Sequence, residues 1–202
     1  MKIYRFASPA PAIWNLLKTI VLVGGFWAAF LVAVPYGIAR ASHELELRDF
    51  LFQPLPELAY VAFGTSMLLG VWAMFTVALV GRGTPMLFDA PRKLVIRGPY
   101  AWMRNPLVVA GIGQGIAATL YTGAALVLPC VVGWVVFCQV LVWMVEQPEL
   151  ERNFGRDFEA YRRSVRYWLP MRRRWVPDRR DGRPISLDEI DITSSRRKRA
   201  SR

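Results

Sequence analysis

A short polar segment, residues 94–106, carries the residue types best suited to chemistry, and it stands directly before the longest uncharged run of the chain. Because proline has no N–H to donate, Pro106 is better placed to open a helix than to continue one. Such a helix would direct its free N–H groups and positive dipole end towards Arg104 and Asn105, which suits a carboxylate or a phosphate. The alternative is that Arg97 and Arg104 only anchor the chain to lipid headgroups.

A second candidate is Glu146, which ends the uncharged run of residues 105–145. A carboxylate at a membrane border is costly unless it faces water, a partner charge or a ligand, so Glu146 is a candidate ligand-binding residue. The alternative is that Glu146 is an ordinary charge at the membrane boundary. Apolar residues then recur at spacings of four, four, three, four and three, which predicts one face of an amphipathic helix. This helix either closes over residues 94–106 or lies flat on the lipid surface. The face consists of Leu150, Phe154, Phe158, Tyr161, Val165 and Trp168.

Charge and hydrophobicity are segregated along the chain. It is 54% hydrophobic and yet has a formal net charge of +11, which is unusual for one soluble globule. Charge is absent from residues 19–39, 58–81 and 105–145. Since a bilayer core needs about 20 helical residues, these runs are long enough for one, one and two crossings. The sequence therefore predicts an all-α polytopic membrane protein with about four transmembrane helices and a C-terminal cytoplasmic amphipathic helix.

The distribution of Lys and Arg predicts the orientation. Residues 82–104 contain five basic residues against one acidic residue, whereas residues 40–57 contain two against four. With an even number of crossings, both termini and residues 94–106 then face the cytoplasm. The first apolar run is longer than the core of a signal peptide, so we expect it to remain as a membrane helix.

We expect three parts in the chain: the first two membrane helices (residues 1–81), a catalytic core (residues 82–170) and a basic, disordered tail (residues 171–202). Residues 149–202 hold 16 Lys and Arg against 9 Asp and Glu. Attachment of the tail to anionic lipids explains this charge more simply than nucleic-acid binding, which we do not expect. The Gly- and Pro-rich loop at residues 81–91 is either functional or a plain linker.

The sequence offers no metal site and no disulfide. His43 is the only histidine, and the two cysteines, Cys130 and Cys138, lie in apolar sequence. Glycines 111, 113 and 115 are spaced like a nucleotide-binding loop, but no strand precedes them. We therefore expect them to allow close helix packing.

An ordered set of motifs across residues 83–170 resembles the integral-membrane methyltransferases related to isoprenylcysteine carboxyl methyltransferase and phospholipid N-methyltransferases. The motifs are Leu94-Val95, Gly98-Pro99-Tyr100, Arg104-Asn105-Pro106, Glu146, Leu150, Phe154-Gly155, Tyr161, Val165 and Pro170.

The resemblance implies a membrane-embedded methyltransferase that uses S-adenosylmethionine. Arg104 and Glu146 would be its catalytic residues. The acceptor would be lipophilic or small and amphipathic, with a carboxylate or an amine as the methylated group, and membrane lipids would be partners. The implied cofactor-binding residues are Leu94, Val95, Tyr100, Asn105, Pro106, Val108 and Glu146. The alternative is a non-catalytic membrane scaffold or small transporter.

The chain departs from the family pattern at three positions. Asn105 stands where many members have histidine, Val108 replaces a tyrosine, and Gln147 replaces a second glutamate. The isoprenylcysteine branch also has an arginine on its last membrane helix, and the uncharged run of this chain has none. The resemblance therefore supports cofactor binding more strongly than it supports any particular substrate.

Overall fold

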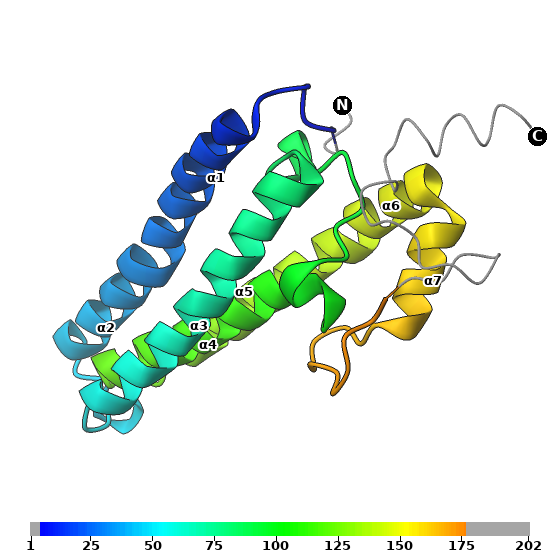
Figure 1. Ribbon diagram of the computed structural model, residues 1–202. Helices are drawn as coiled ribbons and strands as arrows, with labels where there is room; N and C mark the ends of the chain where they lie inside the picture. The colour runs from blue at the N-terminus through cyan, green and yellow to red at the C-terminus, as the bar shows by residue number, and fades with distance from the viewer. Residues whose placement is uncertain (1–4, 177–202) are drawn as a thin grey trace, which may run out of the picture. The chain divides into compact units, whose positions relative to one another are not determined.

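The computed structural model describes residues 5–176, apart from the side chains of Leu31 and Asp49. In this part of the chain the secondary structure is helical, with only two isolated β-bridges, which confirms the predicted all-α class. Figure 1 shows the helices in chain order. The expected disorder of residues 177–202 lies outside the described residues.

The first half of the chain forms two long helices. The first of them runs through α1 (Ala12–Trp27), the π-helical η1 (Ala28–Ala33) and α2 (Val34–Glu44). The second runs through α3 (Pro56–Thr76) and the π-helical η3 (Val77–Gly81). Short 3-10 turns are η2 (Arg48–Phe50), η4 (Leu87–Asp89) and η5 (Gly98–Ala101).

The second half begins with α4 (Pro106–Thr122), which starts at the proline that the sequence predicted. A third long helix follows through α5 (Val127–Leu141), the π-helical η6 (Val142–Glu146) and α6 (Gln147–Phe154), and α7 (Arg156–Ser164) comes last. Both η1 and η6 precede a proline in the first turn of the next helix, Pro35 and Pro148. Since proline clashes with the preceding turn and has no N–H to bond, a locally wider π turn accommodates it.

Three of the described helices are long and apolar enough to cross a membrane: Ala12–Glu44, Pro56–Gly81 and Val127–Phe154. The predicted run at residues 105–145 divides at a turn near residue 123, and this leaves α4 only 17 residues. That length is below the roughly 20 residues of a full crossing, so the structure supports three such helices rather than four. Their apolar side chains are widely exposed, as expected where lipid is the solvent; Leu68 is 73% exposed.

The chain divides into two compact units. Among the described residues, the first comprises residues 5–19, 72–106 and 141–176, and the second comprises residues 20–71 and 107–140.

Close helix packing at small residues forms the second unit. A Cβ added to Gly113 would lie 2.0 Å from Ser66 Oγ, and one added to Gly115 would lie 2.6 Å from Val131. The predicted packing role is therefore confirmed at Gly113 and Gly115. Gly111 has nothing within 4 Å of an added Cβ, so the prediction was wrong there.

A hydrogen-bonded turn closes one end of the second unit. The Phe52 N–H donates to the Gly123 carbonyl oxygen at 2.8 Å, and the Ala125 N–H donates to Phe50 at 2.8 Å. Gly123 has a φ of +67°, which favours glycine. The turn between α4 and α5 is thus fixed against residues 50–52.

The core of the first unit forms where α6 and α7 pack on residues 94–96. Its buried side chains are Leu94, Ile96, Phe154, Phe158, Tyr161 and Val165. The apolar face that the sequence predicted therefore packs on this segment, with the exception of Trp168, which is 41% exposed. Met171 and Trp175 also pack against this core, although they fall in the tail that we expected to be disordered.

The predicted single amphipathic helix is wrong in one respect, because the chain breaks between α6 and α7 at Gly155. This residue has φ +55° and ψ −122°, a conformation that only glycine adopts without strain. The apolar spacing continues across the break, so periodicity alone predicts one continuous helix.

Candidate functional site

Residues 94–105 are held in place by the end of the long helix that contains α3 and η3. Gly98 has a φ of +56°, and a Cβ there would lie 2.6 Å from Thr76 Oγ1. Only glycine therefore allows the chain to turn this close to the helix. The turn leads into η5, and from there to Tyr100 and Arg104.

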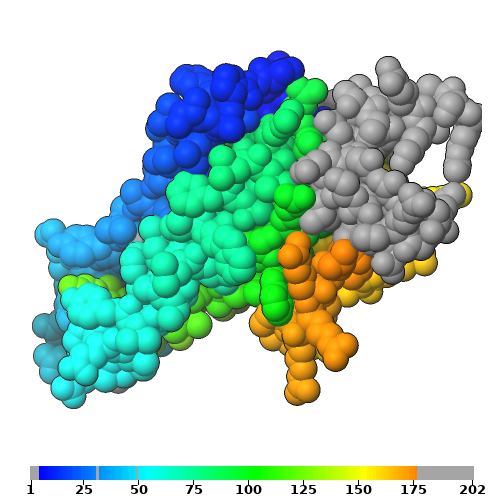
Figure 2. All heavy atoms as spheres, viewed as in Figure 1, coloured from blue at the N-terminus to red at the C-terminus, as the bar shows by residue number. Residues whose placement is uncertain are grey.

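A second segment, the C-terminal strap (residues 165–176), runs beside residues 101–105. The Arg104 N–H donates to the Arg166 carbonyl at 2.9 Å, and the Asn105 N–H donates to the Tyr167 carbonyl at 3.1 Å. Further along, Trp175 donates to Ala101 at 3.0 Å. The strap lies at the surface next to these residues (orange beside green in Figure 2), and its backbone fixes the path of the loop that carries Arg104.

A cavity of about 80 Å³ lies between these segments. Its walls come from residues 93–105, η6 and the start of α6, α7, and the strap. The π-helical η6 contributes two lining residues from one stretch, Val142 and Glu146. The lining residues are Lys93, Leu94, Val95, Tyr100, Arg104, Asn105, Val142, Glu146, Gln147, Leu150, Phe158, Tyr161 and Tyr167.

Most of the residues singled out in the sequence meet in this cavity. Six of them line it: Leu94, Val95, Tyr100, Arg104, Asn105 and Glu146. Two others, Pro106 and Val108, are not among the lining residues. Pro106 is fully buried and starts α4.

Sequence reasoning missed several lining residues, and one of them, Tyr167, contacts both Arg104 and Asn105. Its hydroxyl accepts a hydrogen bond of 3.0 Å from Asn105 Nδ2, and its ring centre lies 4.8 Å from the guanidinium carbon of Arg104. Tyr167 lies in the irregular strap, where no periodicity indicates the direction of a side chain. Lys93 and Val142 were also missed, whereas Gln147 had been noted only as a departure from the family pattern.

The two charged groups of the cavity wall that stand out are Arg104 and Glu146. Arg104 Nε is buried and has no hydrogen-bond partner in the structure, and burial lowers the pKa of the guanidinium below its usual value. Glu146 forms no hydrogen bond or ion pair with any residue of the described chain. Because an unpaired buried donor is costly, Arg104 Nε is left available for an acceptor, and the half-buried Glu146 lines the same cavity.

Two tyrosines stay neutral beside these charges. Burial raises the pKa of Tyr100 well above its usual value, and the charge of Glu146 adds to the effect. Burial also raises the pKa of Tyr161, which the nearby Arg104 partly offsets. The Tyr161 hydroxyl donates to the Tyr100 carbonyl oxygen at 2.8 Å and so ties α7 to η5.

The site therefore combines a cation, a carboxylate and neutral phenols in a partly apolar wall. Such a set suits a ligand that carries both a carboxylate and an ammonium or other cationic group, because each charge meets its opposite. Within residues 5–176 no three His, Cys, Asp or Glu side chains come together as a metal-ligand set.

The helices and the cavity define a class of protein: an all-helical membrane protein with a cavity lined by both polar and apolar residues. A family model described as phospholipid methyltransferase matches residues 56–157, about half of the chain. The chain therefore belongs to the phospholipid methyltransferase family, and it is an integral membrane protein. Comparisons with curated proteins and with solved structures gave no match.

Proposed function

We propose that this protein is an S-adenosylmethionine-dependent methyltransferase that acts on a lipophilic or small amphipathic acceptor within the membrane. The observation that carries the proposal is the meeting of Tyr100, Arg104, Asn105 and Glu146 in one cavity. Membership of the phospholipid methyltransferase family supports the reaction class.

The residues of the cavity fit the amino-acid end of the cofactor. Arg104, with its buried and unpartnered Nε, would bind the carboxylate. Glu146 would bind the ammonium group or offset the charge of the sulfonium. The volume of about 80 Å³ matches a small polar group rather than a whole nucleoside, so the fit concerns this end of the molecule.

The remaining residues would position and shield the site. Leu94 and Val95 provide an apolar wall, and Tyr167 holds Arg104 and Asn105 in place. When bound, the cofactor supplies an electrophilic methyl group on sulfur. The protein then needs mainly to align the acceptor and exclude water, which can contribute several kcal/mol to lowering the barrier.

The arrangement in the membrane is also part of the proposal. We propose that α4 completes a fourth crossing despite its 17 residues, because a shorter helix can be accommodated by local thinning of the bilayer. The excess of Lys and Arg in residues 82–104 then assigns the cavity and both termini to the cytoplasmic side. We further propose that residues 82–170 form the catalytic core.

A methyl-transfer assay tests the proposed function. Purified protein in lipid nanodiscs is incubated with methyl-labelled S-adenosylmethionine and membrane lipid extract, and label is measured in the organic phase. We expect transfer by the wild type and a loss of about a hundredfold or more in Arg104→Gln, because a charge-assisted contact is removed. Arg152→Gln is the matched control, since Arg152 is exposed and pairs with Glu149 outside the cavity.

Absence of label from every lipid fraction, together with no cofactor binding, would favour a non-catalytic scaffold or small transporter. Equal activity of the Arg104→Gln and Arg152→Gln variants would contradict the assigned role of Arg104.

A further inference from the structure

A second cavity, of about 240 Å³, lies in the first unit and shares no residue with the cavity described above. It is lined by Pro9 and Ala10, which precede α1, and by two arginines, Arg82 and Arg92. The predicted loop at residues 81–91 contributes to it and is an ordered part of the structure.

Close packing of two backbone segments brings the arginines together. The Arg92 N–H donates to the Gly81 carbonyl at 2.8 Å. A Cβ on Gly83 would lie 2.7 Å from the Ala90 carbonyl oxygen, and one on Gly81 would lie 2.7 Å from Pro91 Cβ. Both glycines are therefore required for the approach that places residues 82 and 92 at one cavity.

The backbone of Arg82 is strained at this position. Arg82 has φ +55° and ψ +47°, the left-handed conformation that glycine or asparagine adopts more readily. Arg82 is the C-cap of η3, and a left-handed residue commonly ends a helix, so this conformation directs the chain from the helix into the loop at residues 81–91. The chain thus accepts an unfavourable conformation that presents an arginine at the cavity.

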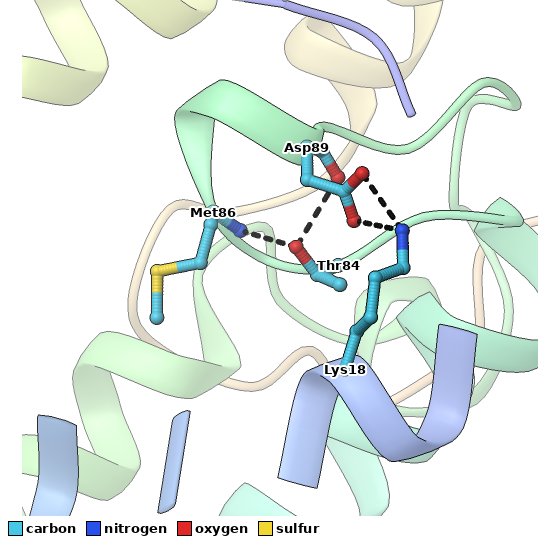
Figure 3. Close-up of polar contacts among 4 residues, drawn as sticks. All are labelled: Lys18, Thr84, Met86 and Asp89. Carbon is cyan, nitrogen blue, oxygen red and sulfur yellow. Dashed lines mark hydrogen bonds and ion pairs between the residues drawn. The ribbon is translucent and has the colours of Figure 1, made fainter. Parts of the chain in front are cut away.

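The acidic residue of this loop does not neutralise the two arginines. Asp89 accepts hydrogen bonds of 2.6 and 2.8 Å from Lys18 Nζ, in a pair that is largely buried. Figure 3 shows this pair next to Thr84, whose N–H and hydroxyl donate to the Asp89 carbonyl at 2.8 and 3.2 Å. Within residues 5–176 the side chains of Arg82 and Arg92 have no hydrogen bond or ion pair.

The cavity lies at the ends of two apolar spans. Arg82 directly follows the span Pro56–Gly81, and Pro9 and Ala10 come just before the span Ala12–Glu44. In a bilayer crossed by these two spans, residues at these positions would lie at the level of the lipid headgroups. The anions that are concentrated at this level are phosphates, and paired arginines bind phosphate oxygens well.

We propose that the Arg82–Arg92 cavity binds a phosphate group, as carried by a membrane phospholipid headgroup or by a soluble phosphate ester, at a site separate from the methyl-transfer cavity. An anion in this cavity would meet the positive charge of both arginines. This site does not depend on methyl transfer, so each proposal can fail without the other.

The test is a calorimetric titration of the full-length protein in maltoside micelles with three compounds. These are dihexanoyl phosphatidylglycerol, glycerol 3-phosphate and the uncharged dihexanoylglycerol. We expect the wild type to bind at least one phosphate compound. The Arg82→Gln/Arg92→Gln variant should bind that compound with an affinity lower by about tenfold or more. Tighter binding of the lipid would identify a headgroup as the source, and equal binding of the two phosphates would identify a phosphate ester in general.

Two further variants keep the test decisive. The Arg40→Gln/Arg48→Gln variant removes the same charge from exposed arginines that already pair with Glu44 and Glu46, and it should bind like the wild type. Arg82→Gly relieves the strained backbone while removing one arginine, so it should fold at least as well and still bind more weakly. The Arg82→Gln/Arg92→Gln and Arg82→Gly variants should bind S-adenosylmethionine with the affinity of the wild type, because these residues do not line the methyl-transfer cavity.

The proposal is overturned if neither phosphate compound binds the wild type. It is also overturned if the Arg82→Gln/Arg92→Gln variant binds as tightly as the wild type, or if the two double variants lose equal affinity.

Discussion

Replacement of Tyr161 by phenylalanine tests how the candidate site is held together. The Tyr161 hydroxyl donates to the Tyr100 carbonyl at 2.8 Å, and Tyr161 is only 4% exposed. The variant keeps the ring, which lies 5.5 Å from the ring of Trp175, so the loss is confined to the hydrogen bond. Leaving this partly buried carbonyl without its donor costs about 1–2 kcal/mol. For a chain of this size that corresponds to a fall of about 2–8 °C in Tm.

Thermal unfolding followed by tryptophan fluorescence in maltoside micelles measures this change. Tyr60→Phe is the matched control, because Tyr60 is 64% exposed and its hydroxyl has no hydrogen bond within residues 5–176, where its ring lies next to that of Tyr121. We expect no change in the Tm of the control. Equal Tm values for the two variants would refute the conclusion that this hydrogen bond ties α7 to η5.

Two further predictions concern pH and helix packing. Burial raises the pKa values of Tyr100 and Tyr161 above their usual value near 10, so their stabilisation is present below about pH 10 and is lost as pH rises towards the folded-state values. The Tm should fall above this pH and fall less steeply in Tyr161→Phe; identical slopes would contradict this. Gly113→Ala should lower the Tm because its Cβ would meet Ser66 Oγ. The double variant Gly113→Ala/Ser66→Gly should recover the lost Tm, because the oxygen is then absent. Gly111→Ala, with open space around it, should leave the Tm unchanged or raise it by removing a helical glycine, and a loss equal to that of Gly113→Ala would refute the packing argument.

The sequence predicted those features that depend on local chemistry. Segregation of charge identified the apolar helices, and the missing N–H of proline located the start of α4 at Pro106. The apolar spacing identified the face that packs on residues 94–96. Each of these features follows from a local property of the sequence: the burial of apolar side chains away from water, or the missing N–H of proline.

Features that depend on irregular backbone could not be predicted. Gly155 breaks the predicted helix through its own dihedral angles, while the apolar spacing continues on both sides. Tyr167 reaches the cavity because the strap pairs with Arg104 and Asn105, which are over 60 residues away in the sequence. Arg82 and Arg92 likewise line one cavity because the Arg92 N–H donates to the Gly81 carbonyl, which their spacing in the sequence does not indicate.

Calorimetric titration of S-adenosylmethionine into the detergent-solubilised protein tests the central claim most directly. We expect saturable binding by the wild type and binding about tenfold or more weaker in Glu146→Gln, which removes the charge and keeps the shape of the side chain. Glu151→Gln should bind like the wild type, because Glu151 pairs with Arg162 and does not line the cavity. No heat of binding at high cofactor concentration, or equal affinity in the Glu146→Gln and Glu151→Gln variants, would contradict the cofactor site.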